Sequence, residues 1–167
     1  ENAGAAIAAL RVLKKGNPEA AVTRATWPAR MQRLSTGPLI EAAPEAEIWL
    51  DGGHNPAGGK AVAATLARMP ARETHLICGM LNTKDVGGYL TPIAPQIASL
   101  TAVSIPGEAN TLPVEATEAA AKASGMTARS SVDVLTALRE ITARNPRARV
   151  LICGSLYLAG QILKENG

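Results

Sequence analysis

The chain has 167 residues, of which 47% are hydrophobic and 19% are charged, so it is long and apolar enough to fold as a globular domain with a core. Its net charge of +3 comes with arginines scattered over many segments, and only 2% of its residues are aromatic, so neither a dense basic patch nor a stacking surface for bases is expected. The composition therefore argues against an intrinsically disordered chain and against a nucleic-acid partner.

The first predicted element is a helix over residues 3–15, which has apolar residues at helical spacing and a stop signal at Lys14-Lys15-Gly16. Asn17-Pro18 then breaks the helix, and residues 22–29 are expected to be a connection, with a domain boundary near residue 25. Because a helix start already stands at the second residue, we expect the chain to be a piece of a larger protein.

Residues 31–41 are predicted to form a short hairpin or an edge strand. After them, short apolar or β-prone runs alternate with segments of helical spacing, which implies parallel strands joined by right-handed crossovers. The predicted strands are 48–51, 75–79, 100–105, 126–129 and 150–153, and the predicted helices are 57–69, 85–98, 114–124, 132–144 and 155–164. We therefore predict a three-layer, Rossmann-like α/β domain, with a mostly parallel sheet of about six strands, one antiparallel edge strand, and helices on both faces.

Cys78 and Cys153 each lie in an apolar run that is typical of a buried strand. With neither a C-x-x-C pair nor zinc-ligand spacing, they are expected to be core residues, and no metal site is expected in this chain. No apolar run approaches the roughly 18 residues of a membrane span, and residues 1–4 lack the basic start of a secretory signal. We expect a cytoplasmic protein with no membrane partner.

The stretch from Ile48 to Pro56 is the strongest candidate site. Its apolar run ends in a carboxylate, two glycines, an imidazole and an amide ahead of a predicted helix, and α/β proteins bind anions and ligands where a strand, a glycine turn and a helix follow one another. A phosphate-binding loop is excluded, because His54 stands where its first glycine would be and Ala61 where its Ser or Thr would be. The dinucleotide pattern fails as well, since Asn55 occupies its second glycine position.

Asp51 and His54 carry the chemistry of this stretch. An acceptor at the position of Asp51 either reaches a ribose hydroxyl or only orders the glycine turn, and spacing alone does not separate these two interpretations. His54 either binds a carboxylate or phosphate or only bonds to backbone, and its place at the expected crevice favours a function.

Further candidates follow other elements. Arg30 stands on a proline-containing connector, where a guanidinium holds anionic oxygens or stacks on adenine, although a solvated surface charge is the commoner interpretation. The segments from Gly79 to Asp85 and from Gly154 to Tyr157 follow predicted strands, and Lys84 and Ser155 either meet a ligand or serve only at helix starts. Because the carboxyl ends of parallel strands meet at one edge of a sheet, these motifs predict a binding site for a phosphorylated or carboxylated small molecule.

Four motifs stand in order along the chain: Trp27-Pro28-Ala29-Arg30, Leu50-Asp51-Gly52-Gly53-His54-Asn55-Pro56, Gly79-Met80-Leu81-Asn82-Thr83-Lys84-Asp85, and Gly154-Ser155-Leu156-Tyr157-Leu158-Ala159-Gly160. Together they resemble the C-terminal domain of the folylpolyglutamate synthase/dihydrofolate synthase family, which belongs to the Mur ligases. The usual family forms are W-P-G-R, D-G-A-H-N-P, G-x-x-x-D-K-D and G-S-L-Y, so the chain departs from them at Ala29, Gly53 and residues 83–85. The resemblance covers essentially the whole chain but only the last third or so of such an enzyme.

The resemblance implies part of an ATP-dependent ligase that adds L-glutamate to dihydropteroate, to a reduced folate such as tetrahydrofolate, or to both, through an acyl phosphate. Residues 1–25 would be the last helix and the linker of the central ATPase domain, and residues 26–167 the C-terminal domain. The P-loop and the magnesium ligands would belong to the other domains, so no catalytic residue is expected in this chain, and the fragment alone is expected to be inactive.

The resemblance also implies roles for individual residues. Asn2, Arg30 and Asp51 would contact ATP, and His54 and Ser155 would bind glutamate. Additional loop contacts are expected from Asn55, Lys84, Asp85 and Tyr157. Two alternatives stay open: a non-catalytic nucleotide-binding α/β module, and the C-terminal domain of another Mur-type amide ligase.

Overall fold

The computed structural model describes residues 2–166, with side chains from residue 3 onward. At its centre lies a six-stranded sheet in the order β1-β2-β6-β3-β4-β5, in which β1 runs antiparallel to β2 and the other neighbouring strands are parallel. The strands are β1 (Gln32–Arg33), β2 (Glu47–Leu50), β3 (Thr74–Cys78), β4 (Ser99–Ala102), β5 (Ala128–Ser130) and β6 (Arg149–Cys153). The predicted sheet, with its one antiparallel edge strand, is confirmed.

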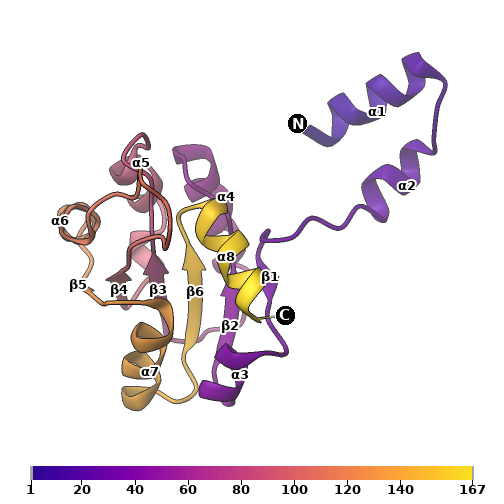
Figure 1. Ribbon diagram of the computed structural model, residues 1–167. Helices are drawn as coiled ribbons and strands as arrows, with labels where there is room; N and C mark the ends of the chain where they lie inside the picture. The colour runs from indigo at the N-terminus through magenta and orange to yellow at the C-terminus, as the bar shows by residue number, and fades with distance from the viewer. Residues whose placement is uncertain (1, 167) are drawn as a thin grey trace.

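Helices cover both faces of the sheet, which makes the predicted three layers (Figure 1). One face is covered by α3 (Pro38–Ala42), α7 (Val134–Arg144) and α8 (Leu156–Asn166). The other face is covered by α4 (Pro56–Leu66), α5 (Val86–Leu90) and α6 (Val114–Ala123).

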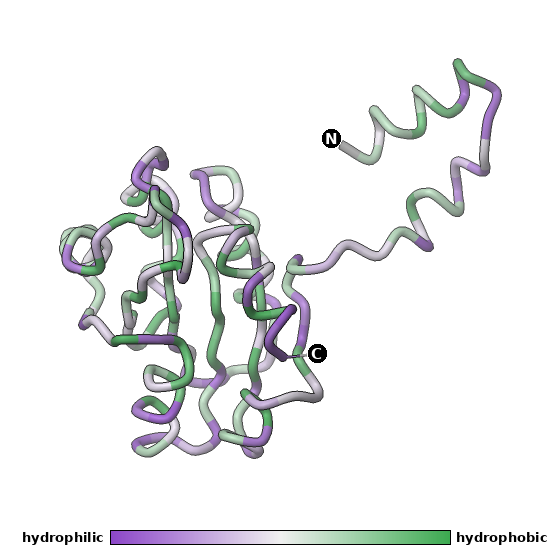
Figure 2. The backbone as a smooth tube through the Cα atoms, in the orientation of Figure 1, coloured by the Kyte–Doolittle hydropathy of each residue, from purple (hydrophilic) through white to green (hydrophobic). Residues whose placement is uncertain are grey.

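Side chains that alternate along each strand divide the core between these two layers. In β6, Val150 and Ile152 pack with α7 and α8, whereas Leu151 and Cys153 pack with α4 and α5. Every residue of β3 and β6 is buried, as expected for the middle strands of a sheet that is covered on both faces, and Figure 2 shows β6 as a largely green, hydrophobic strand. Cys78 pairs in register with Cys153, and both are free, buried thiols, so their predicted place in the core is confirmed.

The prediction for residues 31–41 is only half right. Gln32–Arg33 forms the edge strand, but Pro38–Ala42 forms α3 instead of the second arm of a hairpin. Gly37 stands before this helix with a positive φ of 94°, and Pro38 follows at the first helical position, which is the position that proline favours. The strand that pairs with β1 is therefore β2, which comes after α3.

The helix predicted over residues 85–98 is also wrong in its second half. α5 ends at Leu90, and only a short 3-10 turn, η1 (Ala94–Gln96), follows it. Pro92 and Pro95 explain the break, because proline lacks the N–H that a continuing helix needs.

Part of the connection predicted over residues 22–29 is helical. The first helix ends at Leu13, and Asn17-Pro18 starts the next, α2 (Pro18–Thr23), because the Asn17 side chain accepts hydrogen bonds from the backbone N–H groups of Glu19 and Ala20 at 2.9 and 3.1 Å. The helix predicted over residues 3–15 is present as α1 (Asn2–Leu13).

α1 and α2 extend away from the sheet and are joined to β1 by a connector, residues 24–31 (Figure 1). Val12, Leu13 and Trp27 are exposed along this arm. The domain boundary near residue 25 stays a prediction. Among residues 2–166, every helix is too short or too polar to cross a bilayer.

A partly buried ion pair links the amino ends of β2 and β6. Arg149 is 3% exposed, and its Nε lies 3.0 Å from Glu47 Oε2, while its Nη2 donates to the carbonyl of Pro70 at 3.1 Å. Arg72 adds a second cation, 3.6 Å from Glu47 Oε1. Burial raises the pKa of Glu47, but the hydrogen bond and charge of Arg149, together with Arg72, outweigh burial and hold this pKa below its ordinary value.

This ion pair predicts a specific acid dependence. A carboxyl whose pKa is lowered by folding adds stability above its ordinary pKa and loses it as the pH falls through the folded-state value. In urea unfolding of the chain, the contribution of Glu47 to the free energy of unfolding should therefore be constant from about pH 8 to 6 and decline below about pH 4.5. Glu47→Gln should flatten this decline and cost about 1–2 kcal/mol at pH 7. Glu45→Gln, at an exposed position, is the control, and an unchanged acid limb in Glu47→Gln would contradict the assignment.

Candidate functional site

The candidate site lies where β2, β6 and β3, three adjacent strands, end at the same edge of the sheet. The glycine turn, residues 51–55, joins β2 to α4; the segment from Gly79 to Asp85 joins β3 to α5; and Gly154-Ser155 joins β6 to α8. These three segments lie together at the carboxyl edge of the sheet, as predicted.

Asp51 connects the glycine turn to the connector that precedes β1. Its side chain is nearly buried, at 5% exposure, and each carboxylate oxygen accepts a hydrogen bond from backbone. Oδ1 accepts from the N–H of Gly53 at 2.7 Å, and Oδ2 accepts from the N–H of Met31 at 2.8 Å. Asp51 therefore does order the turn, as one of its two interpretations predicted, and a carboxylate with four lone-pair sites still has capacity for a ligand.

The connector around Arg30 is held in an unusual backbone conformation. Ala29 and Met31, the two neighbours of Arg30, have positive φ values of 54° and 41°, which cost L residues about 1–2 kcal/mol each. Backbone contacts fix this conformation, because the carbonyl of Ala29 accepts from the Gly52 N–H at 2.9 Å and the N–H of Ala29 donates to Gln32 Oε1 at 2.8 Å. Arg30 Nη1 also donates to the Ala29 carbonyl, at 3.0 Å, which places the guanidinium beside the glycine turn.

His54 and Asn55 complete the turn. His54 is partly buried, and its Nδ1 lies 2.8 Å from the carbonyl of Gly52. Because a carbonyl only accepts, Nδ1 carries the proton, and Nε2 of the neutral imidazole remains an acceptor for another group. Asn55 caps α4 by accepting the Gly58 N–H at 2.8 Å, so its side chain has a structural role.

A first pocket, of about 370 Å³, opens beside this turn. It brings together four of the predicted site residues, Arg30, Asp51, His54 and Asn55. Gly52 and Gly53 of the turn also line it, and the remaining wall comes from residues that the sequence did not indicate, Met31 and, in α4, Gly58, Ala61, Val62 and Thr65. No motif marked them, because they line the pocket only through the packing of α4 against the connector.

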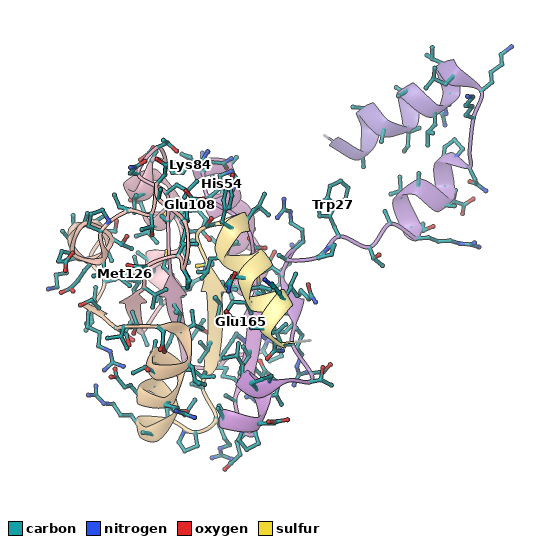
Figure 3. All side chains as sticks on the ribbon, viewed as in Figure 1. Trp27, His54, Lys84, Glu108, Met126 and Glu165 are labelled. Carbon is teal, nitrogen blue, oxygen red and sulfur yellow. The ribbon has the colours of Figure 1, made fainter. Side chains whose placement is uncertain are left out.

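A second pocket, of about 220 Å³, lies on the other side of His54. His54, Lys84, Ser155 and Tyr157 line it together with Leu81, Gly154 and Leu156. Ser155 is 2% exposed, and its Oγ accepts the N–H of Tyr157 at 3.0 Å, which leaves its own hydroxyl proton to donate elsewhere. His54 therefore lies between the two pockets, and Figure 3 shows it at the same end of the molecule as Lys84.

Two predicted site residues are not placed in either pocket. Asp85 caps α5 by accepting the Gly88 N–H at 2.8 Å, and it lines neither pocket. The side chain of Asn2 lies outside the part of the chain that the structure describes. Within residues 2–166, no group of three or more His, Cys, Asp and Glu side chains is arranged to hold a metal ion.

Cys78, Cys153 and Tyr89 are buried together in the core layer that contains α4 and α5. The hydrogen bond between the two thiols, together with burial, raises the pKa of Cys78 well above its ordinary value, so this sulfur stays a protonated core group. Gly154 passes directly over it with a φ of 103°, and a Cβ at Gly154 would lie 2.7 Å from the carbonyl oxygen of Gly79 and 2.8 Å from Cys78 Sγ.

Comparison with known proteins supports the same family. Residues 29–156 match the family model described as Mur ligase, glutamate ligase domain. The folylpolyglutamate synthase of Lacticaseibacillus casei is 29% identical over 137 residues, and the dihydrofolate synthase/folylpolyglutamate synthase of Mycobacterium tuberculosis is 30% identical over 152 residues. Each alignment covers 81% of this chain but 29% of the relative, so the chain spans less than a third of their length.

A solved structure agrees with these relatives. The folylpolyglutamate synthase of Mycobacterium tuberculosis, complexed with ADP and AMPPCP, matches 88% of this chain and 34% of its own at 30% identity, with a TM-score of 0.71.

The packing around Gly154 predicts that Gly154→Ala destabilises the chain. The added methyl group would meet a backbone oxygen at a residue that also needs a positive φ, so we expect a loss of at least about 2–3 kcal/mol in urea unfolding. Gly160→Ala is the matched control, because Gly160 lies in α8 with open space around its Cβ position and should gain about 0.5–1 kcal/mol. Equal stabilities for the two variants would refute this account.

Proposed function

This chain belongs to the Mur ligase family, to its glutamate ligase domain, and we propose that it is the C-terminal domain of an ATP-dependent ligase that adds L-glutamate to dihydropteroate, to a reduced folate, or to both. The two named relatives support this substrate class, and the ADP and AMPPCP in the related structure support nucleotide use. The observation that carries the proposal is the place of His54 between two pockets of different chemistry.

The first pocket is proposed to hold ATP. Arg30 supplies a guanidinium for phosphate oxygens or for stacking on the base, and Asp51 supplies an acceptor for a ribose hydroxyl. The bond from the Met31 N–H to Asp51 and the bond from Arg30 to the Ala29 carbonyl hold both groups beside the glycine turn before the nucleotide arrives.

The second pocket is proposed to hold glutamate. The ammonium of Lys84 and the hydroxyl of Ser155 are donors for a carboxylate, and Ser155 has its proton available because its oxygen already accepts from the Tyr157 N–H. Nε2 of His54 is an acceptor that faces the amine of the incoming amino acid in this arrangement. Tyr157, which is 60% exposed, forms the rim of the pocket.

The remaining parts of the reaction are proposed to belong to the rest of the enzyme. Residues 1–25 would be the last helix and linker of the central ATPase domain, residues 26–167 the C-terminal domain, and Asn2 a further ATP contact. Phosphoryl transfer to the folate carboxyl needs magnesium and a phosphate cradle, which we assign to the other domains. This domain would close over ATP and glutamate, exclude water from the acyl phosphate and align the glutamate amine, whose attack releases phosphate.

Two alternatives remain, and each can be distinguished from the proposed ligase. A non-catalytic nucleotide-binding module is consistent with the lack of a metal-binding cluster in residues 2–166, and a P-loop domain encoded upstream would argue against it. Another Mur-type amide ligase is disfavoured by the Gly154-Ser155-Leu156-Tyr157 segment, which the folate-ligase resemblance includes.

An assay of the full-length parent protein is the first test. With glutamate and ATP, we expect ligation to dihydropteroate, to tetrahydrofolate, or to both, measured as ADP and phosphate release that depends on the pterin substrate. Turnover of neither substrate would discard the proposed function.

Single variants of the parent test the two pockets. Asp51→Ala should raise the KM for ATP and His54→Ala the KM for glutamate, each by about tenfold or more, because each removes a polar contact to its substrate. Asp133→Ala, which removes the N-cap of α7 away from both pockets, should leave both constants unchanged while costing about 1 kcal/mol of stability. The opposite pattern for Asp51 and His54 would mean that the two pockets are exchanged.

Residues 1–167 alone are predicted not to ligate glutamate and to bind ATP weakly at best. Both glycine-motif tests fail in this chain, so it lacks a phosphate cradle of either kind. Calorimetric titration of the chain with ATP and an assay with all substrates measure this, and robust ligation by the chain alone would overturn the proposed division of labour.

A further inference from the structure

Tyr89 lies directly beneath the glycine turn, although no motif in the sequence marks it. It belongs to α5 and is fully buried, in the core layer that also contains α4, Cys78 and Cys153. A Cβ built on Gly53 would lie 3.3 Å from Tyr89 Cε2 and 3.6 Å from the Tyr89 hydroxyl. The same point lies 2.7 Å from Asp51 Oδ1, so the hydroxyl and the carboxylate flank one small gap beside Gly53.

The Tyr89 hydroxyl is an unused donor. Among the residues that the structure describes, no atom pairs with it in hydrogen-bond geometry, and the Cys153 thiol beside it is a weak partner. A buried hydroxyl without a partner lowers stability, so such a group calls for an explanation. Burial, aided by the nearby thiols and the Asp51 carboxylate, raises the pKa of Tyr89 well above its ordinary value, so the hydroxyl keeps its proton at physiological pH.

Gly53 keeps the gap between these two groups open. Its backbone is not left-handed, so a glycine is not required there by φ. The family that the chain resembles usually has alanine at this position, and here its methyl group would stand 2.7 Å from Asp51 Oδ1 and 3.6 Å from the Tyr89 hydroxyl, so it would crowd both groups. The absence of a side chain at Gly53 therefore relieves crowding beside both the Asp51 carboxylate and the Tyr89 hydroxyl.

We propose that Tyr89 is a positioning residue for Asp51. When nucleotide occupies the first pocket, the Tyr89 hydroxyl donates a hydrogen bond to Asp51 Oδ1. This inference rests on the proposed assignment of Asp51 to ATP. In the structure Oδ1 is held by the N–H of Gly53, and a glycine backbone has more accessible conformations than that of any other residue. When the turn shifts to admit the ribose, Tyr89 replaces that bond and keeps the carboxylate oriented.

Nucleotide affinity of the full-length protein carries the test. We expect Tyr89→Phe to weaken ATP binding by about tenfold in calorimetric titration, with the KM for glutamate within about twofold of wild type. Its thermal stability should not fall, because the variant removes an unpartnered hydroxyl. Thr117→Val is the matched control, since it deletes another fully buried, unpartnered hydroxyl, in α6, and should leave ATP affinity unchanged.

A double-mutant cycle separates positioning from a general packing effect. If Tyr89 acts through Asp51, then Tyr89→Phe should cost no further affinity in an Asp51→Ala background. Wild-type ATP affinity in Tyr89→Phe, or additive losses in the double variant, would overturn the inference even where ligation is intact. If the parent protein binds ATP but does not ligate, the proposed function is overturned, and the ATP affinity of Tyr89→Phe still tests the role of Tyr89. A parent protein that binds no ATP would overturn both.

Discussion

The carboxylate of Asp51 is the constraint on which the geometry of this edge depends. It is almost buried and accepts one backbone N–H from the connector and one from the glycine turn, so it fixes two segments that lie twenty residues apart. Buried backbone N–H groups need an acceptor, and a short acid at the end of β2 satisfies two of them with one side chain. Any ligand that recruits Asp51 must therefore share it with the framework that positions Arg30.

The rest of the site follows from the topology. β6 is the last strand in the chain, yet it lies between β2 and β3, so Ser155 comes beside His54 from a hundred residues away. Because β2, β6 and β3 are parallel and adjacent, their carboxyl ends deliver three loops to one edge. His54, at the middle of these loops, lines both pockets, which is why one small turn serves two kinds of substrate group in our proposal.

The sequence allowed the sheet and the edge that carries the site to be predicted, because strand periodicity and helix caps are local signals. It misled where one local signal has two meanings: Asn17-Pro18 suggests a helix break but starts α2, and Pro38 suggests part of a hairpin or edge strand but starts α3. Met31 and Tyr89 could not be found at all. Their roles arise from the packing of the connector and α5 against the turn, which no spacing in the chain encodes.

Two of the departures from the usual family motifs, Ala29 and Gly53, have opposite physical effects at one place. Ala29 keeps a left-handed conformation that glycine adopts without cost, and its buried methyl group and backbone bonds compensate for that strain, so the connector is stiffer than a glycine would make it. Gly53 removes a methyl group from the turn that faces the connector, so the turn is more easily moved. Compared with a chain that has the usual glycine at position 29 and alanine at position 53, the connector is therefore less mobile and the turn more mobile. A domain built in this way would hold Arg30 fixed through the bond between Gly52 and Ala29, and would adjust to its ligand at Gly53.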